Sequence, residues 1–205
     1  KDNGAEVLFR GAMMPSIEIA LSELRGGWRG GPVRLELKKG GGKESFRIFS
    51  DKNGIKITSA GDAGLLYGAY HLLRMQNTGA DMSNIDVSET PAFDLRILNH
   101  WDNPDGSIER GYAGHSLWRW DELPGVVSPR YREYARANAS VGINGAVLNN
   151  VNASPTILTK DNLVKVKAIA DELRPYGVKT YISVNFASPM VVGGLPTADP
   201  LDKGV

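Results

Sequence analysis

The sequence predicts an α/β protein with two domains. In the first part of the chain, alternating apolar and polar residues indicate short strands, and apolar residues at helical spacing indicate two helices. In the second part, short apolar runs alternate with longer helical stretches, which is typical of β-α-β units around a parallel sheet. We therefore expect a small α/β domain over residues 1–90 and a second, parallel α/β region over residues 91–205.

The composition is that of an ordinary globular protein, with 41% hydrophobic and 23% charged residues. The 24 Lys and Arg residues nearly balance the 23 Asp and Glu residues, so no excess of positive charge is present to hold a polyanion. Nucleic acid is therefore not expected as a partner. Cysteine is absent, which excludes disulfides, thiolate metal sites and a cysteine nucleophile. Since no apolar run approaches the roughly 18 residues of a membrane span, no such span is expected.

The first domain begins with one predicted helix and three predicted strands. Residues 15–25 place apolar side chains at helical spacing and are followed by glycines, which predicts an amphipathic helix. Strict alternation predicts strands at 33–37, 45–49 and 55–58. The stretch 38–43 lacks the Gly-Lys-Ser/Thr ending of a phosphate-binding loop and is predicted to be a hairpin tip.

A second apolar stripe predicts a helix over residues 62–76, with Asp62 as its N-cap. This helix is expected to cover one face of the sheet. The polar run from Asn77 to Thr90, closed by Pro91, is predicted to be the linker between the domains.

The second region is predicted to contain strands at 95–98, 143–148 and 178–184, separated by helices at 130–141 and 161–175. The apolar residues of the second helix, from Leu163 to Leu173, are expected to point inward. Two glycines stand between a helix and the next strand, where a positive φ can end the helix: Gly142 and Gly177.

Asparagine follows or ends each of these strands, at Asn99, Asn149 and Asn185. The carboxyl ends of parallel strands meet on one face of such folds, and that face carries the site. An asparagine at a strand end also suits a turn, so a single one would not distinguish the two roles. Three asparagines at equivalent positions favour a pocket that their side chains line.

The most specific motifs surround these strand ends. The loop after residue 98 reads NHWDN, then a short Pro/Asp/Gly turn, then SIERGYAG. Further stretches read GLLYGAYHLLR (64–74), VGINGAVLNNVNA (141–153) and ELRPYGVKTYISVNFASP (172–189). In this order the motifs resemble glycoside hydrolase family 67, the α-glucuronidases that act on glucuronoxylan fragments.

The resemblance implies a non-catalytic leading domain followed by the first three βα units of an incomplete (β/α)8 TIM barrel. A closed barrel takes about 250 residues, so residues 91–205 are too few to form one. The resemblance also implies inverting hydrolysis of α-1,2-linked (4-O-methyl)glucuronic acid from xylo-oligosaccharides in xylan degradation. The partners would be glucuronoxylan-derived oligosaccharides. Two alternatives stay open: another barrel glycosidase of β-hexosaminidase type, and a non-catalytic carbohydrate-binding module.

Glycoside hydrolysis needs two carboxyl groups that flank the scissile bond. In the resembling family the acid lies in a later Lys-Ala-Asn-Ser-Glu motif and the base carboxylates lie later still, and none of these motifs occurs here. Among the carboxylates predicted at strand ends, which are Asp102, Asp105 and Glu109, Asp102 is the best candidate. No catalytic residue is assigned, and this chain alone is expected to be inactive.

What remains is one wall of a sugar pocket, predicted from Trp101, Asp102, Asn150, Val151, Asn152 and Asn185. Trp101 offers a flat face on which a sugar ring can stack, and the resembling family places a Trp at its sugar site. The alternative is a Trp that packs between domains. Val151 matches a position where the family receives the 4-O-methyl group, and the alternative is a valine that anchors its loop. The asparagine amides suit sugar hydroxyls.

No metal or cofactor is expected, because His71, His100 and His115 do not have metal-ligand spacing. The chain begins at Lys1 rather than Met, which is consistent with a removed leading segment. The compartment stays unknown, with a periplasmic or extracellular location slightly favoured over the cytoplasm. A homodimer formed through regions outside this chain also stays open.

Overall fold

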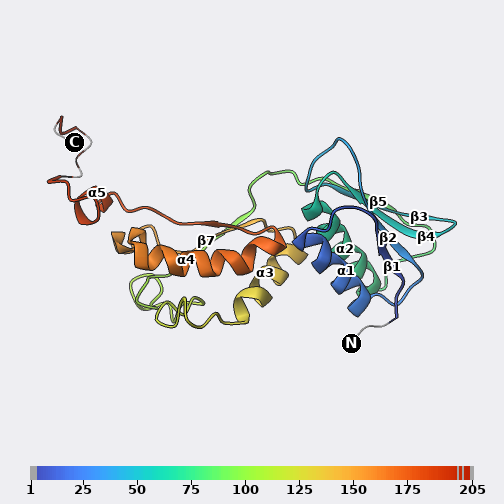
Figure 1. Cartoon of the computed structure of the whole chain (residues 1–205), viewed down its shortest axis with the longest axis horizontal. Coiled ribbons are helices and arrows are strands. Elements are labelled where there is room, and N and C mark those ends of the chain that lie inside the picture. The colour runs from blue at the N-terminus through green and yellow to red at the C-terminus, as the bar shows by residue number, and fades with distance from the viewer. Residues whose placement is uncertain (1–3, 198, 200, 204–205) are drawn as a thin grey trace. The chain divides into compact units, whose positions relative to one another are not determined.

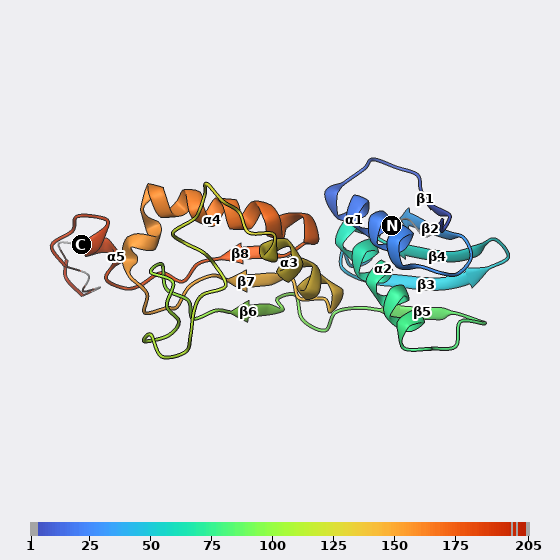
Figure 2. The same cartoon turned by 90° about the horizontal axis from the view of Figure 1, so that it is seen from below.

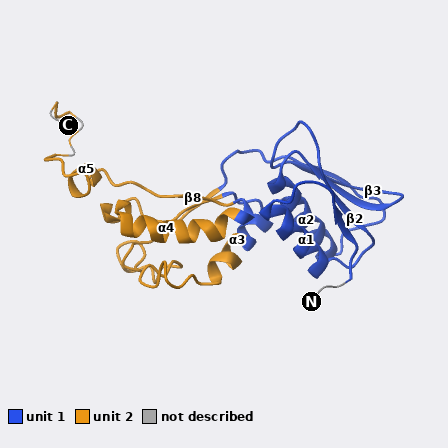
Figure 3. Ribbon diagram, in the orientation of Figure 1, with its two compact units in different colours: residues 1–96, 136–144, 175–177 blue, residues 97–135, 145–174, 178–205 orange. Residues whose placement is uncertain are grey.

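The computed structural model describes residues 4–197, 199 and 201–203, and the chain divides into two compact units (Figure 3). Unit 1 comprises residues 1–96, 136–144 and 175–177, and unit 2 comprises residues 97–135, 145–174 and 178–205. Both units contain helices and strands, so the predicted mixed α/β class is confirmed.

Unit 1 is built on a five-stranded sheet with the order β1-β2-β4-β3-β5. The strands are β1 (Val7–Phe9), β2 (Val33–Leu37), β3 (Phe46–Asp51), β4 (Gly54–Ser59) and β5 (Asp86–Glu89). β1, β2 and β4 run parallel, whereas β3 is antiparallel to both β4 and β5. Because β2 and β3 are not neighbours, residues 38–43 do not form the predicted hairpin tip. The hairpin instead joins β3 to β4.

Two helices cover one face of this sheet. α1 (Pro15–Gly27) and α2 (Asp62–Asn77) lie side by side against it (Figure 1). The core between sheet and helices is fully buried and includes Ile17, Leu24, Val33, Ile48, Ile57, Leu65, Leu66 and Leu72. The predicted N-cap of α2 is wrong, because Gly61 occupies the cap position and Asp62 is the first helical residue. From there its carboxylate still lies at the positive end of the helix dipole.

The run predicted to be a linker contains a strand. β5 pairs with β3, and Arg47 of β3 binds both carboxylate oxygens of Asp86 at 2.8 and 2.9 Å. The remaining residues of β5 are polar or only half-buried. The apolar alternation on which a strand prediction depends is therefore missing from this edge strand, as it is from the three-residue β1.

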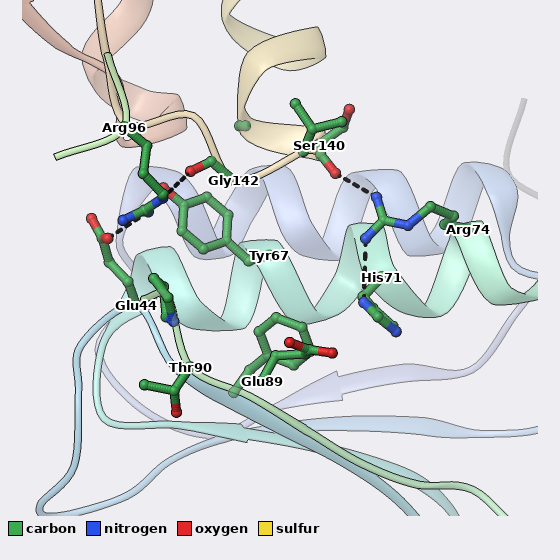
Figure 4. A pocket seen from close by; sticks show the side chains of 13 residues that line it. Glu44, Tyr67, His71, Arg74, Glu89, Thr90, Arg96, Ser140 and Gly142 are labelled. Carbon is green, nitrogen blue, oxygen red and sulfur yellow. Dashed lines mark hydrogen bonds and ion pairs between the residues drawn. The ribbon is translucent and has the colours of Figure 1, made fainter. Parts of the chain in front are cut away.

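Short segments distant in sequence complete unit 1 through two arginines (Figure 4). Arg74 of α2 donates to the carbonyl of Ser140 at 2.8 Å. Arg96 donates to the carbonyl of Gly142 at 2.6 Å and pairs with Glu44 at 2.6 Å. A guanidinium can satisfy several acceptors at fixed angles, so each arginine ties backbone from another part of the chain to this unit.

Unit 2 contains a three-stranded parallel sheet with the order β6-β7-β8. The strands are β6 (Ile97–Asn99), β7 (Gly145–Val147) and β8 (Lys179–Tyr181), and they lie side by side with the same direction (Figure 2). Along the chain, α3 (Arg130–Ser140) separates β6 from β7, and α4 (Lys160–Leu173) separates β7 from β8, as predicted. The shorter elements are the 3₁₀ turns η1 (Pro155–Leu158) and η2 (Arg174–Tyr176) and the helix α5 (Ser188–Val191).

Two features of the helices bear on the predictions. Gly142 and Gly177 have φ of +79° and +75°, so the glycines predicted to end the helices have the required backbone. On α4, Ile169 and Leu173 are fully buried, but Leu163 is 41% exposed and the prediction that it points inward is wrong. Among the described residues, no helix is long and apolar enough to pass through a lipid bilayer.

Candidate functional site

The candidate site lies at the carboxyl ends of the three parallel strands. The register places Asn99 opposite Val147, and Val147 opposite Tyr181, so the chain leaves all three strands at the same end of the sheet (Figure 2). The loops that follow the strands carry every residue predicted to contact a sugar.

Trp101 has a fixed backbone and an exposed ring. Its carbonyl accepts a hydrogen bond from the backbone N–H of Glu109 at 2.8 Å. The next carbonyl, that of Asp102, accepts from the backbone N–H of Asn150 at 2.8 Å. Trp101 is 44% exposed, so the indole presents an apolar face from a backbone that is tied to two other segments. Aromatic faces of this kind suit stacking against the C–H bonds of a sugar.

Asp102 points into the protein. It is 3% exposed, and its carboxylate accepts hydrogen bonds from Ser116 Oγ at 2.5 Å and from the Leu117 N–H at 3.3 Å. These donors come from the same loop, so the carboxylate organises the loop. The predicted contact of Asp102 with a sugar stays a prediction.

An aromatic cluster joins this loop to α3. Trp118 is fully buried, and its ring centroid lies 5.3–5.4 Å from those of His100, Tyr131 and Tyr134. His100 Nε2 is 2.7 Å from the Tyr134 hydroxyl, and burial lowers the pKa of His100 against the opposite effect of the Asp102 carboxylate. Trp118 is therefore a core residue of unit 2, and a nearby hollow of about 560 Å³ is lined by His100, Asp102 and Trp118 among others.

The asparagines after β7 divide into buried and exposed residues. Asn149 is 1% exposed, and its side-chain amide donates to the Ser183 carbonyl at 3.0 Å and accepts from the Ser183 N–H at 2.9 Å. Asn150 is 3% exposed, and its Oδ1 accepts from the backbone N–H of Asn152 at 2.9 Å. Val151 is 51% exposed and Asn152 is also exposed. Two buried amides thus hold a loop that presents Val151 and Asn152 to solvent.

Asn185 connects the loops after β7 and β8. It is half-buried, its Oδ1 accepts from the Ala187 N–H at 2.8 Å, and its Nδ2 lies 3.5 Å from the Ala153 carbonyl. Both ends of this amide are engaged with backbone. Its predicted contact with a sugar stays a prediction.

One carboxylate near the strand ends, that of Asp105, is poorly suited to acid catalysis. Hydrogen bonds from Ser107 hold the pKa of Asp105 below its usual value, whereas a general acid needs a raised pKa near neutral pH. Within the described part of the chain, no group of three His, Asp or Glu side chains could hold a metal ion.

Sequence reasoning missed the hydrogen-bonding roles of two residues in the loop after β6. Glu109 and Asn103 hold the loop after β6 through backbone and amide hydrogen bonds. From the sequence, Glu109 was considered only as a carboxylate at a strand end and Asn103 only as part of a motif. The Pro-Asp-Gly turn after Asn103 indicated a folded-back loop. It did not indicate which backbone groups the turn would bring together.

This fold is found among glycoside hydrolases of known structure. It aligns with a family GH115 4-O-methyl-α-glucuronidase with specificity for decorated arabinogalactans, at a TM-score of 0.63 and 13% identity, over 100% of this chain and 33% of that one. It aligns with a GH138 enzyme targeting pectin rhamnogalacturonan II at a TM-score of 0.62 and 16% identity, over 85% and 24% of the two chains. At these identities the likeness concerns the fold alone.

Sequence comparison identifies the family. The glycosyl hydrolase family 67 middle domain matches residues 75–205. The probable α-glucuronidase A of Aspergillus terreus is 45% identical over 165 residues, which are 79% of this chain and 19% of that protein. The chain belongs to glycosyl hydrolase family 67, which confirms the resemblance and sets the β-hexosaminidase alternative aside. It spans about a fifth of the length of this relative.

We expect Asn149→Ala to lower the free energy of unfolding by about 1–3 kcal/mol, because both backbone groups of Ser183 lose their buried partner. The matched control is Asn152→Ala, which removes an exposed amide and should change stability by less than about 0.5 kcal/mol. Urea unfolding of both variants measures the difference. A change in the free energy of unfolding as small in Asn149→Ala as in the control would show that the Asn149 side chain does not stabilise the junction of β7 and β8.

Proposed function

We propose that this chain is part of an α-glucuronidase that hydrolyses α-1,2-linked (4-O-methyl)glucuronic acid from xylo-oligosaccharides, with inversion at the anomeric carbon. Membership in family 67 is the observation that carries the proposal. The partners would be glucuronoxylan-derived oligosaccharides. The chain would supply one wall of the sugar site, with Trp101 and Val151 as its apolar surfaces.

We propose that residues 1–90 form the non-catalytic leading domain and residues 91–205 the first three βα units of a (β/α)8 barrel. The order β6-α3-β7-α4-β8 and the parallel pairing support this assignment. So do the apolar side chains of unit 2 that remain at the surface, among them Leu98, Leu163 and Val184, because further barrel elements would cover them.

The catalytic carboxyl pair is expected outside residues 1–205, since the chain lacks the family's acid and base motifs. We therefore expect the whole protein to release (4-O-methyl)glucuronic acid from aldouronic acids and residues 1–205 alone to release none. Product analysis by chromatography measures both. Sugar binding without turnover in the whole protein would favour the alternative of a non-catalytic carbohydrate-binding module, and turnover by residues 1–205 would make Asp102 the first carboxylate to test.

Trp101→Ala in the whole protein should lower kcat/KM by roughly 5- to 150-fold, or about 1–3 kcal/mol, because it removes a stacking face. The fold should persist, since the ring is 44% exposed. Phe93→Ala is the matched control, because it removes an exposed aromatic ring that precedes β6, at the amino end of the strand. An unchanged kcat/KM in Trp101→Ala would favour the alternative that Trp101 packs between domains.

Val151→Asn should shift selectivity against the 4-O-methylated sugar. The substitution replaces an exposed apolar side chain by an amide. A methyl group placed against this amide would leave it poorly hydrogen-bonded. Val164→Asn is the control, because Val164 on α4 is also 51% exposed. The measurement is the ratio of kcat/KM on methylated and unmethylated aldouronic acids, and an unchanged ratio in Val151→Asn would remove Val151 from the pocket.

A further inference from the structure

Glu109 has an unusual backbone conformation. Its φ is +58°, and within the described part of the chain it is the one residue other than glycine with a positive φ. Side chains with a Cβ disfavour this left-handed region, so such a residue persists where the surrounding contacts hold it there.

Its two backbone groups bind loops from different strands. The N–H of Glu109 donates to the Trp101 carbonyl at 2.8 Å, in the loop after β6. The carbonyl of Glu109 accepts from the side-chain amide of Asn103 at 2.8 Å and from that of Asn150, after β7, at a longer 3.5 Å. One residue thus connects the loop that carries Trp101 with the loop that carries Val151.

Asn103 stabilises this arrangement from the other side of the turn. Its backbone N–H donates to the Ser107 carbonyl at 2.8 Å, and its amide also donates to Ser107 Oγ at 2.9 Å. The chain between Asn103 and Glu109 is therefore closed on itself. Removal of this amide would take away the shorter of the two side-chain hydrogen bonds to the Glu109 carbonyl.

We propose that Glu109 is a positioning residue, whose left-handed backbone, together with the amides of Asn103 and Asn150, fixes Trp101 relative to Val151. The inference rests on the proposed function, because it assigns these two side chains to the sugar site. The backbone of Glu109 carries the role, since no hydrogen bond or ion pair engages its carboxylate among the described residues. A sugar stacked on Trp101 would then reach Val151 without a cost for ordering the loops.

The test compares three single variants of the whole protein. Glu109→Gly keeps a backbone free to adopt a positive φ, so it should retain KM and kcat within about twofold. Glu109→Val is β-branched and opposes this conformation, and Asn103→Ala removes the amide. Both should raise KM for aldouronic acids about fivefold or more with kcat changed less than about twofold, as expected for loss of binding that is uniform between substrate and transition state.

Two further measurements separate positioning from general damage. In a Trp101→Ala background, Asn103→Ala should have little additional effect on KM, because the residue it positions is already absent. Amide hydrogen exchange at Glu109 and Asn150, measured without substrate, should accelerate about tenfold or more in Asn103→Ala and Glu109→Val and stay unchanged in Glu109→Gly. Circular dichroism and unfolding curves check that each variant folds, and Asn103→Ala carries the test if Glu109→Val does not.

Several results would overturn the inference. An equal rise of KM in Glu109→Gly and Glu109→Val would assign the role to the carboxylate. An effect of Asn103→Ala that is the same with and without Trp101 would show that it acts elsewhere. Unchanged amide exchange at Glu109 and Asn150 in Asn103→Ala would contradict the positioning role, and this measurement does not depend on turnover. Absence of turnover of aldouronic acids by the wild-type protein would by itself reject only the proposed function.

Discussion

Parallel pairing of β6, β7 and β8 is the constraint on which the candidate site depends. In a parallel sheet the carboxyl ends of all strands lie at the same end of the sheet. Residues that are far apart in sequence therefore become neighbours as soon as the strands are in register. Here the backbone hydrogen bond from Asn150 to Asp102 continues the pairing of β6 and β7 beyond the strands themselves. The side-chain amide of Asn149 does the same between β7 and the chain after β8. The loops are thus extensions of the sheet.

The elements predictable from sequence were those with a strong apolar period. α1, α2 and α4 were placed within a few residues because their apolar stripes repeat with the helical period. β1 and β5 were missed because one is very short and the other polar, and the strand order of unit 1 could not be read from local patterns. Leu163 was misplaced for a different reason. The burial of Leu163 depends on which elements cover the helix at that point, and this is a property of the tertiary structure.

The predicted site residues lie in the loops after the three strands, but the sequence did not indicate which asparagines are buried. An amide can hydrogen-bond a sugar or the backbone of its own protein with the same groups, so the sequence does not distinguish Asn152, which is exposed, from Asn150, which is buried. Trp101 and Val151 are exposed, and their predicted contact with a sugar stays a prediction. The conformation of Glu109 had no signal in the sequence, because glutamate is not among the residues enriched in the left-handed region.

The outer strands of unit 2 have a consequence for handling the chain. Among the described residues, β6 and β8 each pair with β7 alone, so each has a second edge whose N–H and C=O groups face no strand. Such edges can accept a strand from another molecule, and Leu98 of β6, 39% exposed, adds apolar surface beside one of them. These strands carry none of the lysines or prolines at their edges that commonly block such pairing, apart from Lys179 at the start of β8. In concentrated preparations of this chain by itself, we therefore expect these edges to be sites of β-association, limited by the three-residue length of each strand.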